Sequence, residues 1–121
     1  MTIIYQTTFK KIGNFAHDAL QENMLITFKE GAPADLEDYC FIHSHGELQG
    51  NIQVGDIVKF DHYEFKVTAI GNVASFNLKE LGHVTFRFDG ATQAEYPGTI
   101  HLTGKIPQHI DVNSILQIIR N

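Results

Sequence analysis

The chain has 121 residues, of which 43% are hydrophobic and 19% charged, so it can bury a core and is not disordered, collagen-like or coiled-coil. Nine basic residues against 14 acidic ones give a formal net charge of −5, which opposes binding to nucleic acid or anionic membranes. Cys40 is the single cysteine, so it has no partner for an internal disulfide. No stretch approaches the ~18 apolar residues of a spanning helix. We therefore expect one cytoplasmic domain over residues 1–121 with no direct membrane insertion.

In chain order, the hydrophobic pattern predicts eight short strands with turn-forming residues between many of them. They span residues 2–9, 24–29, 40–43, 57–60, 63–69, 84–88, 99–103 and 114–119. In the fifth strand, Tyr63, Phe65 and Val67 alternate with polar residues, which is typical of a strand with one buried face. Eight short strands in a chain of this length favour a closed barrel or a sandwich. We predict a mainly β, single-domain, antiparallel β-barrel-like fold with one or two short helices.

The best-defined helical pattern follows Asn72, a candidate N-cap residue. Ala74, Leu78 and Leu81 share one helical face, and Gly82 follows them as a stop signal. Residues 15–22 and 33–38 are each compatible with a further turn or two of helix. Residues 89–98 have the composition of a surface loop.

The most informative motif is a pair of histidines at the end of the third predicted strand. His43 and His45 are separated by Ser44 and followed by Gly46, which permits a tight turn with accessible backbone. Residues i and i+2 of a strand face the same side, so the two imidazoles are expected to lie together at the surface. Such a pair is suited either to binding a metal ion or to handling a phosphoryl group.

A metal site is one interpretation of this pair. Neutral imidazole is a ligand for zinc, copper, iron or nickel, and His83 and His101 on the polar faces of later strands could complete the set. Metal-binding cupins also carry such a pair on a β-barrel. Their motif, however, needs a glutamate four or five positions after the second histidine, where this chain has Gln49 and Gly50.

Phosphoryl transfer is the other interpretation. A neutral histidine is a competent nucleophile near pH 7 and needs no catalytic triad. Transfer requires in-line approach and donors for the phosphoryl oxygens, and His45, Ser44 and the backbone amides near Gly46 are candidates. Residues 98–105 do not have the spacing of a nucleotide-binding loop, so the phosphoryl donor is expected to be another phosphoprotein.

The remaining chemistry-bearing residues have simpler interpretations. His17, His62 and His109 are expected at the surface, and His83 and His101 on the polar faces of their strands. Cys40 precedes two apolar residues, so we expect it to be buried and unreactive.

Several segments resemble one family over nearly the whole chain. They are residues 5–8, 24–28, 31–36, the motif His43-Ser44-His45-Gly46-Glu47-Leu48, and residues 77–85, 88–90 and 97–99. Together they resemble the glucitol/sorbitol-specific enzyme IIA component of the bacterial phosphoenolpyruvate-dependent sugar phosphotransferase system.

The resemblance implies a phosphoryl relay. The small phosphocarrier HPr would phosphorylate His43, the first histidine of the motif, which would pass the group to the IIB domain of the membrane-associated IIB/IIC transporter. His45 would assist. The residues themselves make Ser44 and Gly46 the candidate contacts of the phosphoryl group, and we expect no cofactor and no metal. The alternatives are a metal- or ligand-binding β-barrel that uses His43 and His45, and a pure interaction module.

Overall fold

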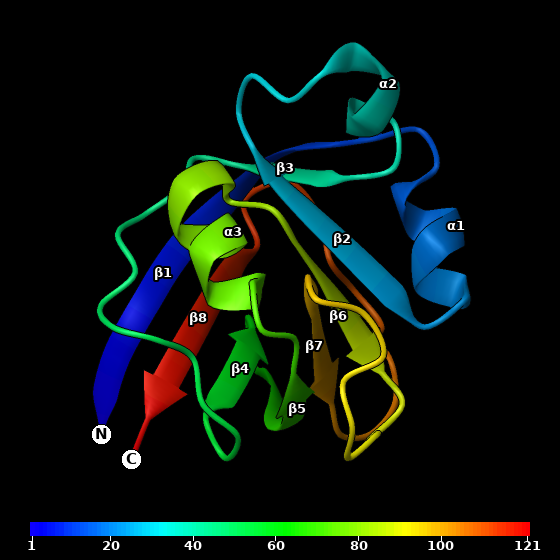
Figure 1. The fold of residues 1–121 in the computed structure, drawn as a ribbon. Helices are drawn as coiled ribbons and strands as arrows, with labels where there is room; N and C mark the ends of the chain where they lie inside the picture. Colours follow the sequence, from blue (N-terminus) through cyan, green and yellow to red (C-terminus); the bar gives the residue numbers. More distant parts are fainter.

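The computed structural model describes residues 1–121 as a closed eight-stranded β-barrel with three short helices (Figure 1). The strands are β1 (Thr2–Ile12), β2 (Met24–Lys29), β3 (Phe41–His43), β4 (Ile57–Phe60), β5 (Tyr63–Ile70), β6 (Val84–Phe88), β7 (Thr99–Leu102) and β8 (Ile115–Arg120). The helices are α1 (Ala16–Gln21), α2 (Ala34–Glu37) and α3 (Ala74–Leu81). The eight predicted strands are confirmed, and the prediction of one or two helices was too low.

The strands close in the order β1-β3-β2-β6-β7-β5-β4-β8. Two neighbouring pairs, β2 with β3 and β6 with β7, are parallel, and the other six are antiparallel. Closure leaves no unpaired strand edge. Because β8 pairs with β1, the two ends of the chain lie side by side (Figure 1).

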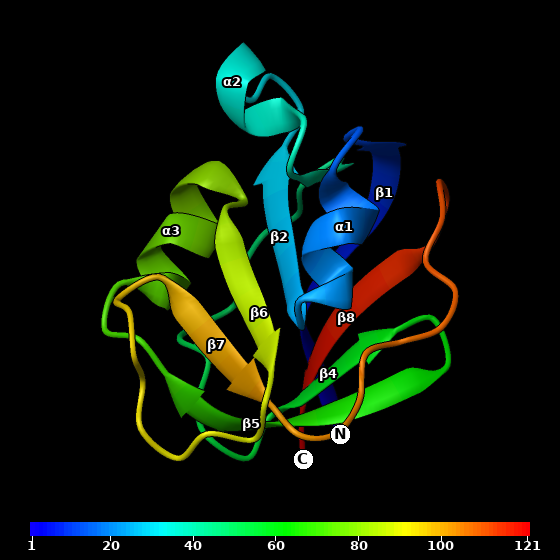
Figure 2. The same cartoon turned by 90° about the vertical axis from the view of Figure 1, so that its right-hand side faces the viewer.

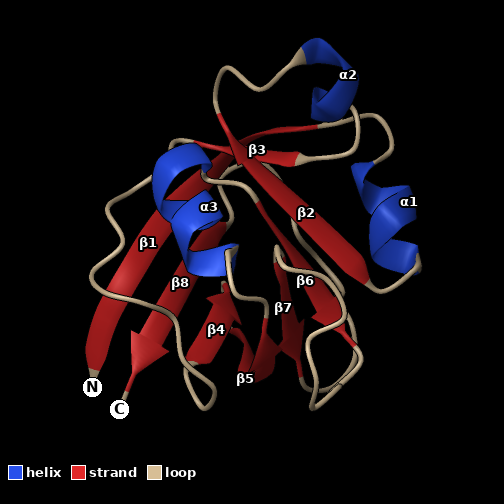
Figure 3. Ribbon diagram, viewed as in Figure 1, coloured by secondary structure: helices blue, strands red, loops and turns tan.

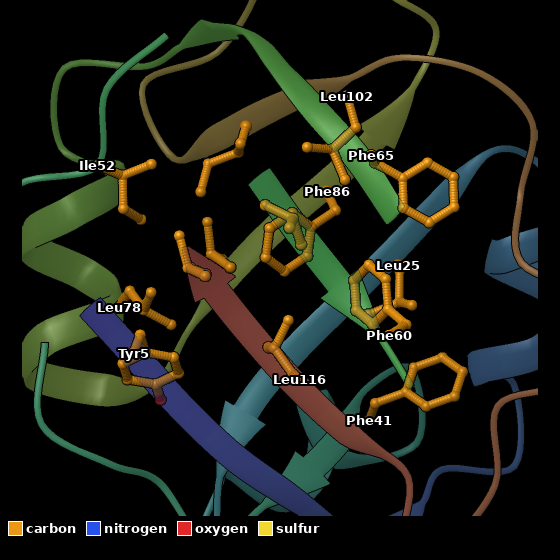
Figure 4. Close-up of a cluster of buried hydrophobic side chains, with 14 of the residues drawn as sticks. Tyr5, Leu25, Phe41, Ile52, Phe60, Phe65, Leu78, Phe86, Leu102 and Leu116 are labelled. Carbon is orange, nitrogen blue, oxygen red and sulfur yellow. The ribbon is translucent and has the colours of Figure 1, made fainter. Parts of the chain in front are cut away.

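The barrel is filled by a cluster of 23 buried hydrophobic residues, many of them large (Figure 4). Phe60 is fully buried near other aromatic rings, including those of Phe86 and Phe88. These inward positions are the apolar members of the two-residue alternation, which is why the sequence pattern predicted the strands well.

Helix α3 connects β5 to β6 and contributes Ala74 and Leu78 to the core. Its N-cap is Val73 without a side-chain cap, not Asn72 as predicted. Its C-cap is Gly82, whose φ of +63° lies in the left-handed region that glycine adopts without strain. The helix therefore ends abruptly, and β6 begins two residues later.

The other two helices lie away from α3. Helix α1 packs against β2 (Figure 2), and α2 lies within the β2–β3 connection at one end of the barrel (Figure 3). Residues 44–56 form a long connection without regular secondary structure from β3 to β4. None of the three helices has the length and apolar character needed to cross a membrane.

Candidate functional site

His43 is the last residue of β3 and is fully buried, with 0% of its surface exposed. Its strand lies between β1 and β2, where His43 pairs with Phe9 on one side and Lys29 on the other. The sequence motif predicted this imidazole at the surface, and that prediction is wrong. The imidazole of His43 is covered by the turn after α3, because Gly82 lies directly against it.

Each ring nitrogen of His43 has defined partners. Nδ1 lies 3.0 Å from the hydroxyl of Thr7 and 3.0 Å from the backbone nitrogen of His45. Nε2 lies 2.8 Å from the carbonyl oxygen of Gly82. A backbone N–H can only donate and a carbonyl can only accept, so these partners require an unprotonated Nδ1 and a proton on Nε2.

Burial also keeps this imidazole neutral. Desolvation lowers the pKa of His43 to about 4, outweighing the hydrogen bond to Gly82, which favours the charged ring. His45 lowers it further, since a second charge nearby is unfavourable. At neutral pH the ring therefore has the uncharged form that a nucleophile needs.

Gly82 has to be a glycine for two reasons. Its left-handed backbone is strained for other residues, and an added Cβ would lie 2.6 Å from Cε1 of His43. Its carbonyl oxygen also accepts a hydrogen bond from the Thr27 hydroxyl at 2.9 Å. The end of α3 is thereby held close to the ring of His43.

His45 lies just beyond β3 and is half-buried, with its ring centroid 5.7 Å from that of His43. Its φ of +68° is unusual for a residue with a side chain and aims its amide at Nδ1 of His43. The motif thus brings the two imidazoles together as predicted, by a turn rather than by strand alternation.

The ring of His45 is held between β1 and α3. Its Nδ1 lies 2.8 Å from the hydroxyl of Tyr5, and its Nε2 lies 3.0 Å from the carbonyl oxygen of Lys79. Burial raises the pKa of Tyr5, so its hydroxyl keeps its proton and donates to Nδ1. Lys79 is in the last turn of α3, where carbonyls lack helical partners.

The two remaining predicted site residues have different surroundings. Ser44 is exposed, and its Oγ lies 3.3 Å from Oγ1 of Thr7. Gly46 passes close to β1, because an added Cβ would lie 2.3 Å from the carbonyl oxygen of Gln6. Both residues adjoin the histidine pair.

Tyr5, Thr7 and Gly82 belong to this site but were not predicted from the sequence. Tyr5, Thr7 and Phe9 alternate along β1 toward the interior, and a polar residue among apolar inward positions was the available signal. Gly82 was recognised only as a helix stop. Its contact with a histidine 39 residues away depends on tertiary structure.

The other histidines do not join this site. His17, His62 and His109 are exposed, as predicted. His101 is fully buried, contrary to the expectation of a polar strand face. Its Nδ1 lies 2.9 Å from a carboxylate oxygen of Asp89, and its Nε2 accepts a hydrogen bond from the backbone N–H of Glu95. His83 is half-buried and contacts the backbone oxygen of Thr27 through Nδ1.

Cys40 is buried, as predicted, and burial raises the pKa of its thiol to about 11, which keeps it protonated. No group of three or more His, Cys, Asp or Glu side chains in the chain is arranged to hold a metal ion. The metal-site alternative therefore lacks a ligand set.

Comparison with known proteins supports the other interpretation. Residues 4–117 match the family described as the glucitol/sorbitol-specific IIA component of the phosphotransferase system (PTS). The proteins named "PTS system glucitol/sorbitol-specific EIIA component" from Shigella flexneri and Escherichia coli (strain K12) are each 56% identical over 117 residues, which are 97% of this chain and 95% of each relative.

A solved structure agrees with the fold. The crystal structure of a PTS IIA component from Enterococcus faecalis V583 superposes with a TM-score of 0.86 at 28% identity, over 95% of this chain and 99% of that one. The chain belongs to the glucitol/sorbitol-specific IIA family of the sugar phosphotransferase system.

Proposed function

We propose that this protein is a phosphocarrier in which His43 accepts a phosphoryl group from phosphorylated HPr and passes it to the IIB domain of a glucitol/sorbitol transporter. The observation that carries the proposal is the neutral, fully oriented imidazole of His43 beside a second imidazole. A phosphocarrier needs such a nucleophile, and family membership supports the role.

The contacts of His43 favour Nε2 as the nitrogen that is phosphorylated. Two donors point at Nδ1 from inside the site, whereas Nε2 has one partner, the carbonyl oxygen of Gly82. Breaking that single hydrogen bond frees Nε2 and leaves the ring held at its other edge. Fixing the ring in this way supplies the orientation on which phosphoryl transfer depends.

A buried acceptor must become accessible during transfer. The residues that cover it are the end of α3 and the two-residue connection to β6, which contains Gly82. Hydrogen bonds from His43 and Thr27 to Gly82 and from His45 to Lys79 hold this segment over the rings. We infer that docking of a partner displaces the segment and breaks the bonds to the two imidazoles. Closing again would exclude water and protect the phosphorylated ring from hydrolysis.

A phosphoryl group adds roughly −1.5 to −2 charges, which need nearby donors. His45 is the assisting residue in our proposal. Its Nε2–H donates a hydrogen bond to the phosphoryl group once it leaves the carbonyl oxygen of Lys79. The exposed hydroxyl of Ser44 and the backbone of Gly46 adjoin the same space and are proposed to contact phosphoryl oxygens. We propose that the relay operates in the cytoplasm, with HPr as donor and the membrane-associated IIB/IIC components as acceptor.

The test is the intact mass of the protein after incubation with phosphoenolpyruvate, enzyme I and HPr. We expect one phosphoryl group on the wild type, labile to acid and stable to base, and none on His43→Gln. His17→Gln, which changes an exposed histidine, is the matched control and should be phosphorylated normally.

The same experiment with His45→Gln distinguishes the two imidazoles. We expect slow but measurable phosphorylation of this variant. Complete loss in His45→Gln with retention in His43→Gln would reverse the assignment of acceptor. No phosphorylation of the wild type, in a reaction where HPr is itself phosphorylated, would refute the phosphocarrier role.

A further inference from the structure

Thr7 is a polar residue at an inward position of β1. Its neighbours in the alternation, Tyr5 and Phe9, belong to the hydrophobic core, and Thr7 itself is only 3% exposed. A valine would fill the same volume without a hydroxyl to satisfy. A buried hydroxyl at this position has to be satisfied by hydrogen bonds, and Thr7 Oγ1 has two such contacts.

The Oγ1 atom of Thr7 lies between the ring of His43 and the surface. It is 3.0 Å from Nδ1 of His43 and 3.3 Å from Oγ of Ser44, which is exposed. A hydroxyl donates one hydrogen bond and accepts others, and it reverses these roles by rotating. The two hydroxyls thus form a short path from the buried Nδ1 to solvent.

This path matters because the resting ring has its proton on the nitrogen that must attack. Nε2 can bond to phosphorus only through its lone pair, so its proton has to be lost and Nδ1 has to carry one instead. Of the partners of Nδ1, the His45 amide can only donate, which leaves Thr7 Oγ1 as the one group able to accept a hydrogen bond from the protonated Nδ1.

We propose that Thr7 is a positioning residue that, together with Ser44, carries a proton to and from Nδ1 of His43 during phosphoryl transfer. The inference rests on the proposed phosphocarrier function. It assigns a chemical role to a residue outside the histidine motif, and to Ser44 a role in addition to phosphoryl contact.

Once the turn opens, Nε2 releases its proton to water while Nδ1 takes one from Thr7, which is resupplied through Ser44 from solvent. The Nε2 lone pair then forms the new N–P bond, and the donor's N–P bond breaks with its electron pair remaining on the donor nitrogen. The donor ring takes up one proton from water and becomes a neutral imidazole. The phosphorylated ring finally returns the Nδ1 proton through Thr7 and Ser44 to water.

The experiment compares Thr7→Val with Thr7→Ser. Valine keeps the shape and removes the hydroxyl, whereas serine keeps the hydroxyl. We expect phosphorylation by phospho-HPr to be about 100-fold slower in Thr7→Val, the scale of an aligned proton-transfer group, and close to the wild-type rate in Thr7→Ser. Thr8→Val, on the opposite face of the same strand, is the matched control and should not change the rate.

A spectroscopic measurement separates this role from a structural one. In ¹⁵N NMR spectra of the unphosphorylated protein, the Nδ1 resonance of His43 should shift in Thr7→Val and not in Thr7→Ser, while Nε2 remains protonated in all three proteins. Ser44→Ala should slow transfer less than Thr7→Val, because water can replace an exposed hydroxyl.

Two results would overturn the inference while leaving the proposed function standing. One is a wild-type rate in Thr7→Val. The other is equal slowing in Thr7→Ser and Thr7→Val, which would mean that the hydroxyl does not account for the effect, because Thr7→Ser keeps it. Phosphorylation that persists in His43→Gln would instead refute the acceptor assignment on which the inference rests.

Discussion

Nε2 of His43 donates a hydrogen bond to the carbonyl oxygen of Gly82 at 2.8 Å, which links the end of β3 to the turn after α3. The adjoining last turn of α3 contacts the second imidazole, because His45 donates to the carbonyl oxygen of Lys79 at 3.0 Å. Both rings of the motif are therefore held by one short segment. Any movement of that segment changes the surroundings of both histidines at once.

Gly82→Ala should destabilise the protein and slow its phosphorylation. The left-handed backbone costs a residue with a Cβ about 1–2 kcal/mol, and the new Cβ would collide with the ring of His43. Urea unfolding measures the first effect and the rate of phosphoryl uptake the second.

Gly90→Ala is the matched control for this prediction. Gly90 has a φ of +64° but open space around the position of a Cβ, so alanine there meets the same backbone strain without a collision. Equal loss of stability in the two variants would contradict the close contact between Gly82 and His43.

Stability should fall between pH 7 and pH 5 because of His43. Its pKa is about 4 in the folded protein, against an ordinary value of 6.5 when unfolded, so the unfolded chain binds more protons over this interval. The contribution of the neutral buried ring to the free energy of unfolding is fully present above pH 6.5 and is lost as the pH falls toward 4. This pKa difference lowers the free energy of unfolding by about 2 kcal/mol at pH 5.

The measurement is urea unfolding at pH 7 and pH 5 for the wild type and two variants. His43→Gln should lose this part of the pH dependence, and His17→Gln should keep it. A His43→Gln variant with the full wild-type pH dependence would show that another group is responsible.

Tyr5→Phe should slow phosphoryl transfer while the barrel stays folded. The aromatic ring remains in the core, and only the hydroxyl that donates to Nδ1 of His45 at 2.8 Å is removed. We expect a stability loss of about 1 kcal/mol, the usual scale for one hydrogen bond.

The transfer rate of Tyr5→Phe should fall by about tenfold, because His45 loses the group that orients it. A tenfold slower rate corresponds to an increase of about 1.4 kcal/mol in the activation free energy. Tyr96→Phe, at an exposed position, is the control and should behave as wild type. An unchanged rate in Tyr5→Phe would mean that the orientation of His45 does not matter for transfer.

Asp56→Ala should destabilise the closed barrel. The buried carboxylate of Asp56 accepts hydrogen bonds from Nε and Nη2 of Arg120 at 3.0 and 2.8 Å, and from the backbone of Gln53. These contacts hold the end of β8 beside β4. Loss of charge-assisted bonds to a buried group should cost about 2–3 kcal/mol in urea unfolding.

Glu37→Gln is the comparison for the ion-pair prediction. Glu37 pairs with Lys11 at the surface, where an exposed pair contributes little to stability. We expect no measurable change in this variant and no effect of Asp56→Ala on the site of phosphorylation. Equal losses in the two variants would mean that the Asp56 pair does not secure the barrel.

Strand positions were most predictable where a strand has one buried and one exposed or half-buried face, as β4, β5 and β6 do. The alternation of Tyr63, Phe65 and Val67 with polar residues marks β5 without any knowledge of its neighbours. Closure into a barrel, with its two parallel pairs, was not predictable in detail. It depends on which strands meet across long connections, and that information is absent from local periodicity.

The sequence by itself determined the strand positions, the end of α3 at Gly82 and the pairing of His43 with His45, because these follow from local spacing and backbone preference. Only the tertiary structure decided that His43 is buried and neutral and that Thr7 contacts it. Burial and hydrogen bonding depend on which distant segments pack together. A residue type can indicate reactivity, but its tautomer and pKa are properties of its surroundings.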